Sequence, residues 1–149
     1  MDILKMQKCH VKDVEEMAKV FYYSDAVCHD IPWENVENTI NEAVSPSEIL
    51  EGYVFDCDGN IAGFGLITKY FESECGGVCV QLMDLFVKSE FRGRGIAKQY
   101  FKFIFDKYSY AKRFRLEAAP DNENAIELYK SLGFHELSYM QMIKEETTV

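Results

Sequence analysis

The chain has 149 residues, 16 of them basic and 25 acidic, and its formal net charge is −9. This acidic balance argues against binding to nucleic acid, which requires clustered lysine and arginine to displace counterions. The hydrophobic fraction of 48% predicts an ordinary globular protein, folded as a single domain over residues 1–149.

Targeting and redox signals are few. The longest apolar runs fall short of the roughly 20 residues that a membrane span needs, and residues 1–5 do not resemble a signal peptide. We therefore expect a cytoplasmic protein with no membrane partner. Scattered cysteines predict reduced thiols, with neither a disulfide framework nor a metal site; they are Cys9, Cys28, Cys57, Cys75 and Cys79.

In chain order, the first half predicts a strand, two helices and a hairpin. The first helix carries apolar residues at helical spacing, and the hairpin contains Asp58-Gly59-Asn60, a strong turn signal. The predicted elements are a strand at 3–8, helices at 11–23 and 32–44, and strands at 52–56 and 61–70.

The second half alternates strands and helices. The predicted elements are a strand at 78–87, a helix at 95–108, a strand at 113–118, a helix at 122–132 and a final strand at 134–144. Together they predict an α+β (mixed α/β) fold. Its central sheet is mixed but mostly antiparallel, with helices on both faces.

Arg92-Gly93-Arg94-Gly95 lies between a predicted strand and a predicted helix. Glycines let the backbone approach a ligand closely, and a helix start presents unpaired N–H groups to an anion. This arrangement predicts a phosphate site. The P-loop pattern does not fit, because the sequence has no Gly-x-x-x-x-Gly-Lys-Ser/Thr run. The dinucleotide pattern does not fit either, because the position three after Gly95 is Lys98 rather than glycine.

Two motifs do fit a known pattern. The first is Arg92-x-x-Gly95-x-Ala97, and the second is Asn122-x-x-Ala125-Ile126-x-Leu128-Tyr129-x-x-x-Gly133-Phe134. In this order and spacing the chain resembles the GNAT superfamily of acetyl-CoA-dependent N-acetyltransferases. The resemblance implies a GNAT-like fold, acetyl-CoA as the co-substrate, and transfer of the acetyl group to a small-molecule or peptide amine.

The resemblance also implies roles for single residues. The backbone of Leu85, Phe86 and Val87 would pair with the pantetheine arm of CoA as an added strand. Asn122 would hydrogen-bond that arm or cap its own helix. The pyrophosphate would be wrapped by seven consecutive residues: Arg92, Gly93, Arg94, Gly95, Ile96, Ala97 and Lys98.

For the chemistry, the resemblance puts Tyr129 near the thioester sulfur, as the general acid that protonates the departing thiolate. The attacking amine must lose a proton, and Asp84 is the first candidate for the base that takes it. Asp84 could equally be a strand-end acid paired with a nearby cation. Some relatives carry a catalytic glutamate where this chain has Gln81, so a base at that position is in doubt. Glu74 and a bound water are the alternatives to Asp84.

The acceptor and the assembly stay open. In GNAT relatives the loop between the first two helices helps form the acceptor pocket, which here includes His29, Asp30 and Trp33. Its aromatic residues, Phe21 among them, could instead be core or dimer contacts, and a homodimer is compatible with the sequence. Two other functions also suit the phosphate site: a non-catalytic acyl-CoA-binding or sensor domain, and a nucleotide-binding module that takes ATP.

Overall fold

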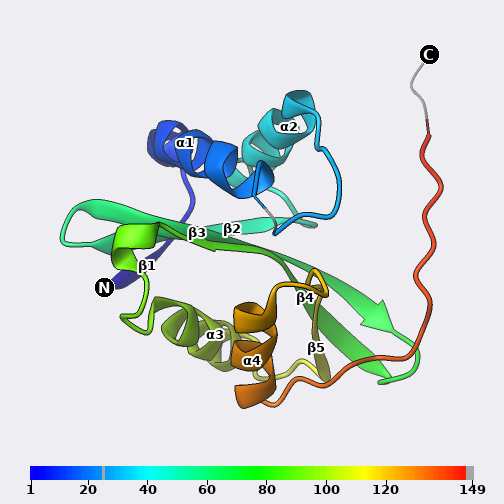
Figure 1. Ribbon diagram of the computed structural model, residues 1–149. Coiled ribbons are helices and arrows are strands. Elements are labelled where there is room, and N and C mark those ends of the chain that lie inside the picture. The colour runs from blue at the N-terminus through cyan, green and yellow to red at the C-terminus, as the bar shows by residue number, and fades with distance from the viewer. Residues whose placement is uncertain (25, 147–149) are drawn as a thin grey trace. The chain divides into compact units, whose positions relative to one another are not determined.

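The computed structural model describes residues 1–24 and 26–146 of the chain (Figure 1). Its contacts divide the chain into two parts, Met1–Ala119 and Pro120–Val149. The first part contains the sheet, three of the helices and most of the predicted donor site.

The first part is built on a five-stranded sheet with the strand order β1-β2-β3-β4-β5. Neighbouring strands from β1 to β4 are antiparallel, whereas β5 runs parallel to β4. The predicted mixed, mostly antiparallel sheet is therefore confirmed. The strands are β1 (Asp2–Lys5), β2 (Glu51–Cys57), β3 (Asn60–Glu72), β4 (Gly77–Val87) and β5 (Arg113–Leu116).

Helices cover both faces of this sheet (Figure 1). On one face, α1 (Val11–Tyr22) and α2 (Trp33–Val44) enclose an apolar core with Phe64, Leu66 and Phe86 of the sheet. On the opposite face lies α3 (Ile96–Lys107). Within the described residues, no helix combines the length and the apolar character needed to cross a membrane.

Gly65 shows how tightly α3 packs against the sheet. A Cβ atom built on Gly65 would lie 2.4 Å from Cζ and 2.5 Å from the hydroxyl oxygen of Tyr100 on α3. Tyr100 is fully buried, so its ring has no room to move aside. Glycine at position 65 is what allows this ring to lie against the backbone of β3.

The β2–β3 hairpin turns at Asp58-Gly59, as the sequence predicts. Both residues have positive φ, 53° for Asp58 and 85° for Gly59. Two consecutive residues with positive φ are typical of the type I′ turn, whose twist matches that of the flanking strands. The turn is also fastened by Asp56, whose Oδ1 accepts a hydrogen bond from the Gly59 amide at 2.7 Å.

A β-bulge interrupts β4 at Met83. Leu66 pairs with Asp84, but the next residue of β3, Ile67, pairs with Leu82, so Met83 is an extra residue on β4. Leu66 belongs to the core under α1 and α2, and Asp84 opposite it therefore faces these helices. Leu82, opposite Ile67, faces α3.

The described residues of the second part form one helix, α4 (Glu123–Ser131), which follows Pro120. Asn122 caps its start and accepts a hydrogen bond from the Ala125 amide at 3.4 Å. Gly133, with φ of 93°, ends the helical segment.

The predicted strand over residues 134–144 is wrong: residues 134–146 form neither helix nor strand. The prediction followed the alternation of apolar residues, but a strand exists only with a neighbour to pair with. Met140, Met142 and Ile143 are 81–86% exposed, whereas a strand buried on one face would hide part of this set.

Candidate functional site

The end of β4 offers a free edge. Within the described chain, the ladder between β4 and β5 ends at the pair Leu82–Leu116. β4 itself continues to Val87, paired with β3 on its other side. Residues 83–87 therefore have a strand of the sheet on one side only. An extended ligand could pair with this edge as an additional strand.

The backbone of β4 alternates between β3 and this free edge. The Lys88 amide donates to the Ala62 carbonyl at 2.8 Å, so Lys88 and, two residues earlier, Phe86 direct their polar groups at β3. Leu85 and Val87 direct theirs outward, and Arg92 Nε accordingly donates to the Val87 carbonyl at 2.9 Å. Of the three predicted strand-pairing residues, Leu85 and Val87 thus present their backbone to the edge, whereas the Phe86 ring fills the core.

A glycine loop leads from this edge into α3. Gly93 and Gly95 have φ of 75° and 76°, a conformation that a side chain would strain. Gly95 is the N-cap of α3 and makes no side-chain cap hydrogen bond in the described chain. Its carbonyl accepts the first helical hydrogen bond, from the Gln99 amide at 3.0 Å. The amides of residues 96–98 precede this bond, so they are available to an anion.

The two arginines of the loop hold its backbone in place. The Arg92 guanidinium lies 5.8 Å from the centroid of the Phe86 ring, in addition to its bond to the Val87 carbonyl. Arg94 donates to the Glu90 carbonyl at 3.0 Å and lies 5.1 Å from the centroid of the Phe91 ring. Both arginines are therefore occupied in fixing the loop, and they add positive charge where the helix amides converge.

Asp84 lies within the free edge, and its Oδ2 accepts a hydrogen bond from the Tyr22 hydroxyl at the end of α1. Burial raises the pKa of Asp84, and the Tyr22 hydrogen bond opposes that rise. Burial and the nearby carboxylate both raise the pKa of Tyr22, so the phenol stays protonated and donates. The predicted pairing of Asp84 with a lysine or arginine is thus replaced by pairing with a phenol.

The other candidate bases lie elsewhere. Glu74 is in the turn before β4, with its side chain 48% exposed and 3.8 Å from Arg113 Nη1. Gln81 Oε1 accepts a hydrogen bond from the Tyr70 hydroxyl at 3.3 Å. Asp84 is the carboxylate that combines burial with a place in the free edge.

The second motif lies in the second part of the chain. Asn122 acts there as the helix cap, one of the two roles considered for it. The Tyr129 ring contacts Phe134 with 6.3 Å between centroids, and burial raises the pKa of its hydroxyl. A raised pKa keeps the phenol protonated, as a proton donor must be. That Tyr129 acts at a thioester stays a prediction.

The aromatic residues near the first two helices are core contacts in part. Phe21 is buried, and Trp33 packs against the same apolar core while Lys19 Nζ lies 5.3 Å from the centroid of its ring. His29 and Asp30 are exposed. The acceptor role predicted for this loop stays a prediction.

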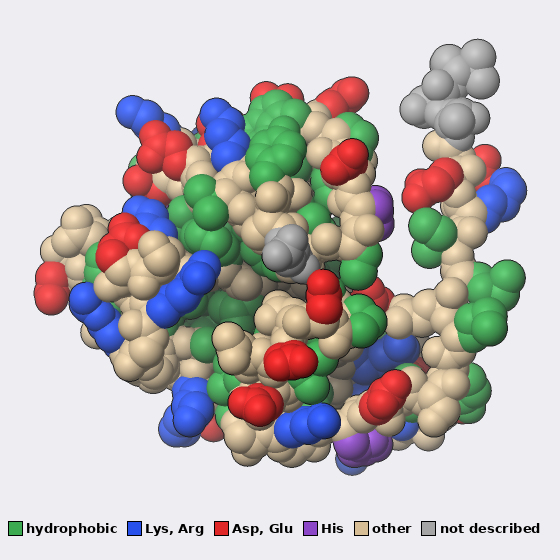
Figure 2. Space-filling view, viewed as in Figure 1, with side chains coloured by type: hydrophobic (Ala, Val, Ile, Leu, Met, Phe, Trp, Pro, Cys, Tyr) green, Lys and Arg blue, Asp and Glu red, His purple; other side chains and the backbone are tan. Residues whose placement is uncertain are grey.

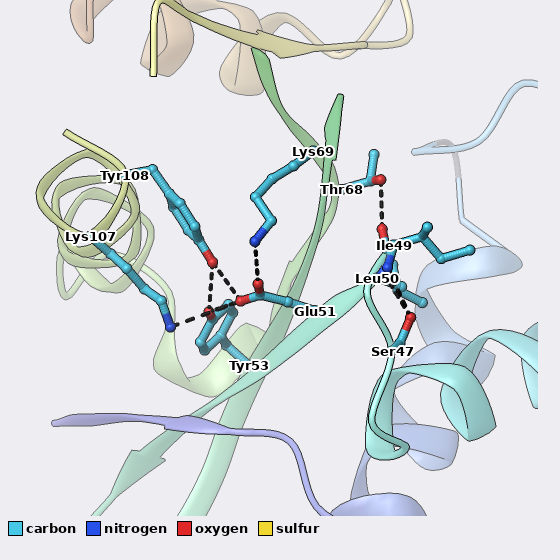
Figure 3. Close-up of polar contacts among 9 residues, drawn as sticks. All are labelled: Ser47, Ile49, Leu50, Glu51, Tyr53, Thr68, Lys69, Lys107 and Tyr108. Atoms are coloured by element: carbon cyan, nitrogen blue, oxygen red, sulfur yellow. Dashed lines mark hydrogen bonds and ion pairs between the residues drawn. The ribbon is translucent and has the colours of Figure 1, made fainter. Parts of the chain in front are cut away.

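Sequence reasoning missed a polar cluster at the far end of α3, centred on Glu51 (Figure 3). Glu51 Oε1 accepts from Lys69 Nζ at 2.8 Å, and Oε2 accepts from the hydroxyls of Tyr53 and Tyr108, each at 2.5 Å. Lys107 Nζ lies 3.8 Å from the same Oε2. The cluster fastens the end of α3 to β2 and β3, and its members are too far apart in sequence for a motif to reveal them.

Two hollows of the structure lie away from the free edge. A cavity of about 10 Å³ among α1, α2 and β3 is apolar and too small for a ligand. A shallow hollow of about 390 Å³ lies between β1 and α3, lined by Asp2, Gln99 and Lys102 among others. Neither contains a predicted site residue, which suits a ligand bound along a strand edge.

On the face shown in Figure 2, charge marks no competing site. Acidic and basic side chains are interspersed over the face shown in Figure 2. No group of three histidine, cysteine, aspartate or glutamate side chains is placed to hold a metal ion in the described part of the chain.

Comparison with known proteins agrees with the kind of site that the geometry indicates. The chain is 34% identical to thialysine N-epsilon-acetyltransferase from Sus scrofa over 82 residues, which are 52% of this chain and 46% of the relative. The chain thus spans about half the length of this curated relative.

Solved structures cover the chain almost completely. The aminoglycoside acetyltransferase AAC(6')-Iy, in complex with a CoA-containing bisubstrate analogue, matches with a TM-score of 0.78 at 20% identity over 98% of both chains. A possible acetyltransferase from Clostridium difficile 630 matches with a TM-score of 0.81 at 14% identity, over 99% of this chain and 98% of the other. At these identities the likeness shows the fold. The profile of the acetyltransferase (GNAT) family matches residues 12–134, and the chain therefore belongs to that family.

Proposed function

We propose that the protein transfers an acetyl group from acetyl-CoA to a primary amine, by direct attack of the amine within a ternary complex. The observation that carries the proposal is the free edge of β4 at residues 83–87, which leads through a glycine loop to the uncapped start of α3. An extended arm and a pyrophosphate joined to it match this order of features along the chain.

In this proposal the donor is held mainly by backbone groups. Leu85 and Val87 pair with the pantetheine arm, and the amides of Ile96, Ala97 and Lys98 bind the pyrophosphate at the positive end of the helix. Asn122 either hydrogen-bonds the arm or keeps its capping role. The outward amide of Leu85 stabilises the negative charge that develops on the carbonyl oxygen.

Asp84 is the proposed base. The amine nitrogen attacks the carbonyl carbon, and Asp84 accepts the proton that the nitrogen releases, directly or through a water. The Tyr22 hydroxyl orients the carboxylate and favours its charged form. When the carbon–sulfur bond breaks, Tyr129 donates its phenolic proton to the thiolate, so that the products are the amide and free CoA.

The names of the relatives support one class of acceptor. By their names, the relatives act on thialysine and on aminoglycosides, which are small molecules with primary amines. We propose a small-molecule amine for this chain as well, with a peptide amine as the alternative.

The test is a panel of amines incubated with acetyl-CoA, in which release of CoA and formation of the amide are both measured. We expect turnover with at least one primary amine, and we expect Asp84→Asn to lose about a hundredfold or more in kcat. Asp106→Asn, which changes an exposed carboxylate paired with Lys102, is the matched control and should retain activity.

Two results would contradict the proposal. Tight CoA binding with no amide formed from any amine would favour a sensor domain. Thermal stabilisation by ATP that CoA does not compete away would favour a nucleotide-binding module.

A further inference from the structure

Beside the proposed site, polar side chains lie on three adjacent strands. We call them the Arg115 cluster: Tyr70 and Glu72 of β3, Gln81 of β4, and Arg113 and Arg115 of β5. Tyr70 is four residues after Leu66 on β3, so both point to the same face. The cluster therefore shares the face of the sheet on which Asp84 lies.

Arg115 reaches across β4. Its Nη1 donates to the Tyr70 hydroxyl at 3.4 Å, and that hydroxyl donates to Gln81 Oε1 at 3.3 Å. Since β4 lies between β3 and β5, the guanidinium extends over β4 near Gln81. Arg115 and Gln81 form the last pair but one before the β4–β5 ladder ends. The Arg115 side chain is 28% exposed, so a ligand can reach it from solvent.

The guanidinium of Arg115 keeps capacity for an anion. Glu72 Oε1 is already bound by Arg113 Nη1 at 2.7 Å, whereas Arg115 Nη1 lies 3.9 Å from it. A guanidinium has five N–H donors in a planar fork that suits a carboxylate. Among the described residues, the Arg115 contacts to Tyr70 and Glu72 are long, 3.4 and 3.9 Å from Nη1, so the fork can still take a ligand.

We propose that Arg115 binds the carboxylate of the acceptor, and that the acceptor is an amino acid whose reacting amine lies at the far end of its side chain. This inference rests on the proposed acetyltransferase function. Gln81 and Asp84 are separated by three residues of strand, about 10 Å. An acceptor of lysine length and the long arginine side chain can cover that span together.

The direction along β4 separates this site from the donor site. The glycine loop and the start of α3 follow Val87, on the far side of Asp84 from Arg115. Phosphates bound at the start of α3 would therefore lie away from Arg115. An anion at Arg115 belongs to the acceptor.

The test compares L-lysine with cadaverine, which has the same terminal amine but no carboxylate, at saturating acetyl-CoA. Wild-type enzyme should prefer lysine and acetylate its side-chain amine, as mass spectrometry of the product would show. Arg115→Gln should lower the lysine-to-cadaverine ratio of kcat/KM about ten- to hundredfold, chiefly through KM for lysine. Lys102→Gln, which changes an exposed cation outside the cluster that pairs with Asp106, is the control and should leave the ratio unchanged.

An equal loss for both amines in Arg115→Gln, or no preference for lysine in the wild type, would overturn the inference while leaving the acetyltransferase proposal intact. If the wild type acetylates neither amine, the full panel of amines decides the proposed function separately, and calorimetry with the enzyme–CoA complex decides the inference. Binding of lysine but not cadaverine, lost in Arg115→Gln, would support it; no binding of lysine would overturn it.

Discussion

Replacing Glu51 with glutamine would remove a carboxylate that Lys69, Tyr53 and Tyr108 all hydrogen-bond (Figure 3). Burial raises the pKa of Glu51, but these hydrogen bonds outweigh burial and lower the pKa from 4.5 to about 2. The difference corresponds to at most about 3 kcal/mol of folding free energy. Because the side chain of Lys69 is 30% exposed, solvent screening reduces this, and we expect Glu51→Gln to cost about 1–2 kcal/mol at pH 7.

The sign of the pH dependence follows from the lowered pKa. The stabilisation by Glu51 is complete above pH 4.5 and is lost as the pH falls toward 2. Urea unfolding of the wild type and of Glu51→Gln at pH 7, 5, 4 and 3 measures the difference in their free energies of unfolding. Glu48→Gln, a change at an exposed residue, is the control. The gap between the proteins should fall by about half between pH 5 and pH 3. Equal stabilities at pH 7, or a gap that does not change with pH, would refute this account of the cluster.

Three further substitutions test the site and the packing around it. Tyr129→Phe should lower kcat about a hundredfold while CoA binding by calorimetry stays the same; unchanged kcat would rule out its role as general acid. Tyr22→Phe removes the hydrogen bond that opposes the raised pKa of Asp84, so the acidic limb of the kcat/KM profile should move to higher pH, and an unmoved limb would separate Asp84 from the reaction. Gly65→Ala places a Cβ 2.4 Å from the Tyr100 ring and should cost about 1–3 kcal/mol in urea unfolding. Tyr100→Leu in the same chain should recover part of that loss; additive costs would contradict this explanation of the packing.

The sequence predicts most of the fold because its signals are local. Asp58-Gly59 takes the positive φ values of a tight hairpin turn, and Gly95 takes the positive φ of the position before α3. Such positions are recognisable because few residues other than glycine, asparagine and aspartate adopt them. The apolar spacing of α1 likewise gives Val14, Met17, Ala18 and Phe21, all of them buried.

The remaining features depend on residues that are distant in the sequence. Tyr22 and Asp84 are 62 residues apart, and Glu51 and Tyr108 are 57 apart; neither pair leaves a spacing signal. The strand predicted at 134–144 failed for a related reason, since alternation indicates which residues could share a face but not whether a partner strand is present.

The bulge at Met83 reverses the alternation of faces along β4. Up to Leu82 the strand follows one alternation of faces, and from Asp84 onward it follows the other. If residues 82–84 formed a regular strand, Asp84 would be in phase with Leu82 and would point at α3, away from Tyr22 and from the face that carries Arg115. The bulge takes up Met83 as the extra residue and thereby keeps the carboxylate on the side of the sheet that carries Tyr22. Deleting Met83 would remove the bulge without exchanging the two faces, because Asp84 would then directly follow Leu82 in the alternation.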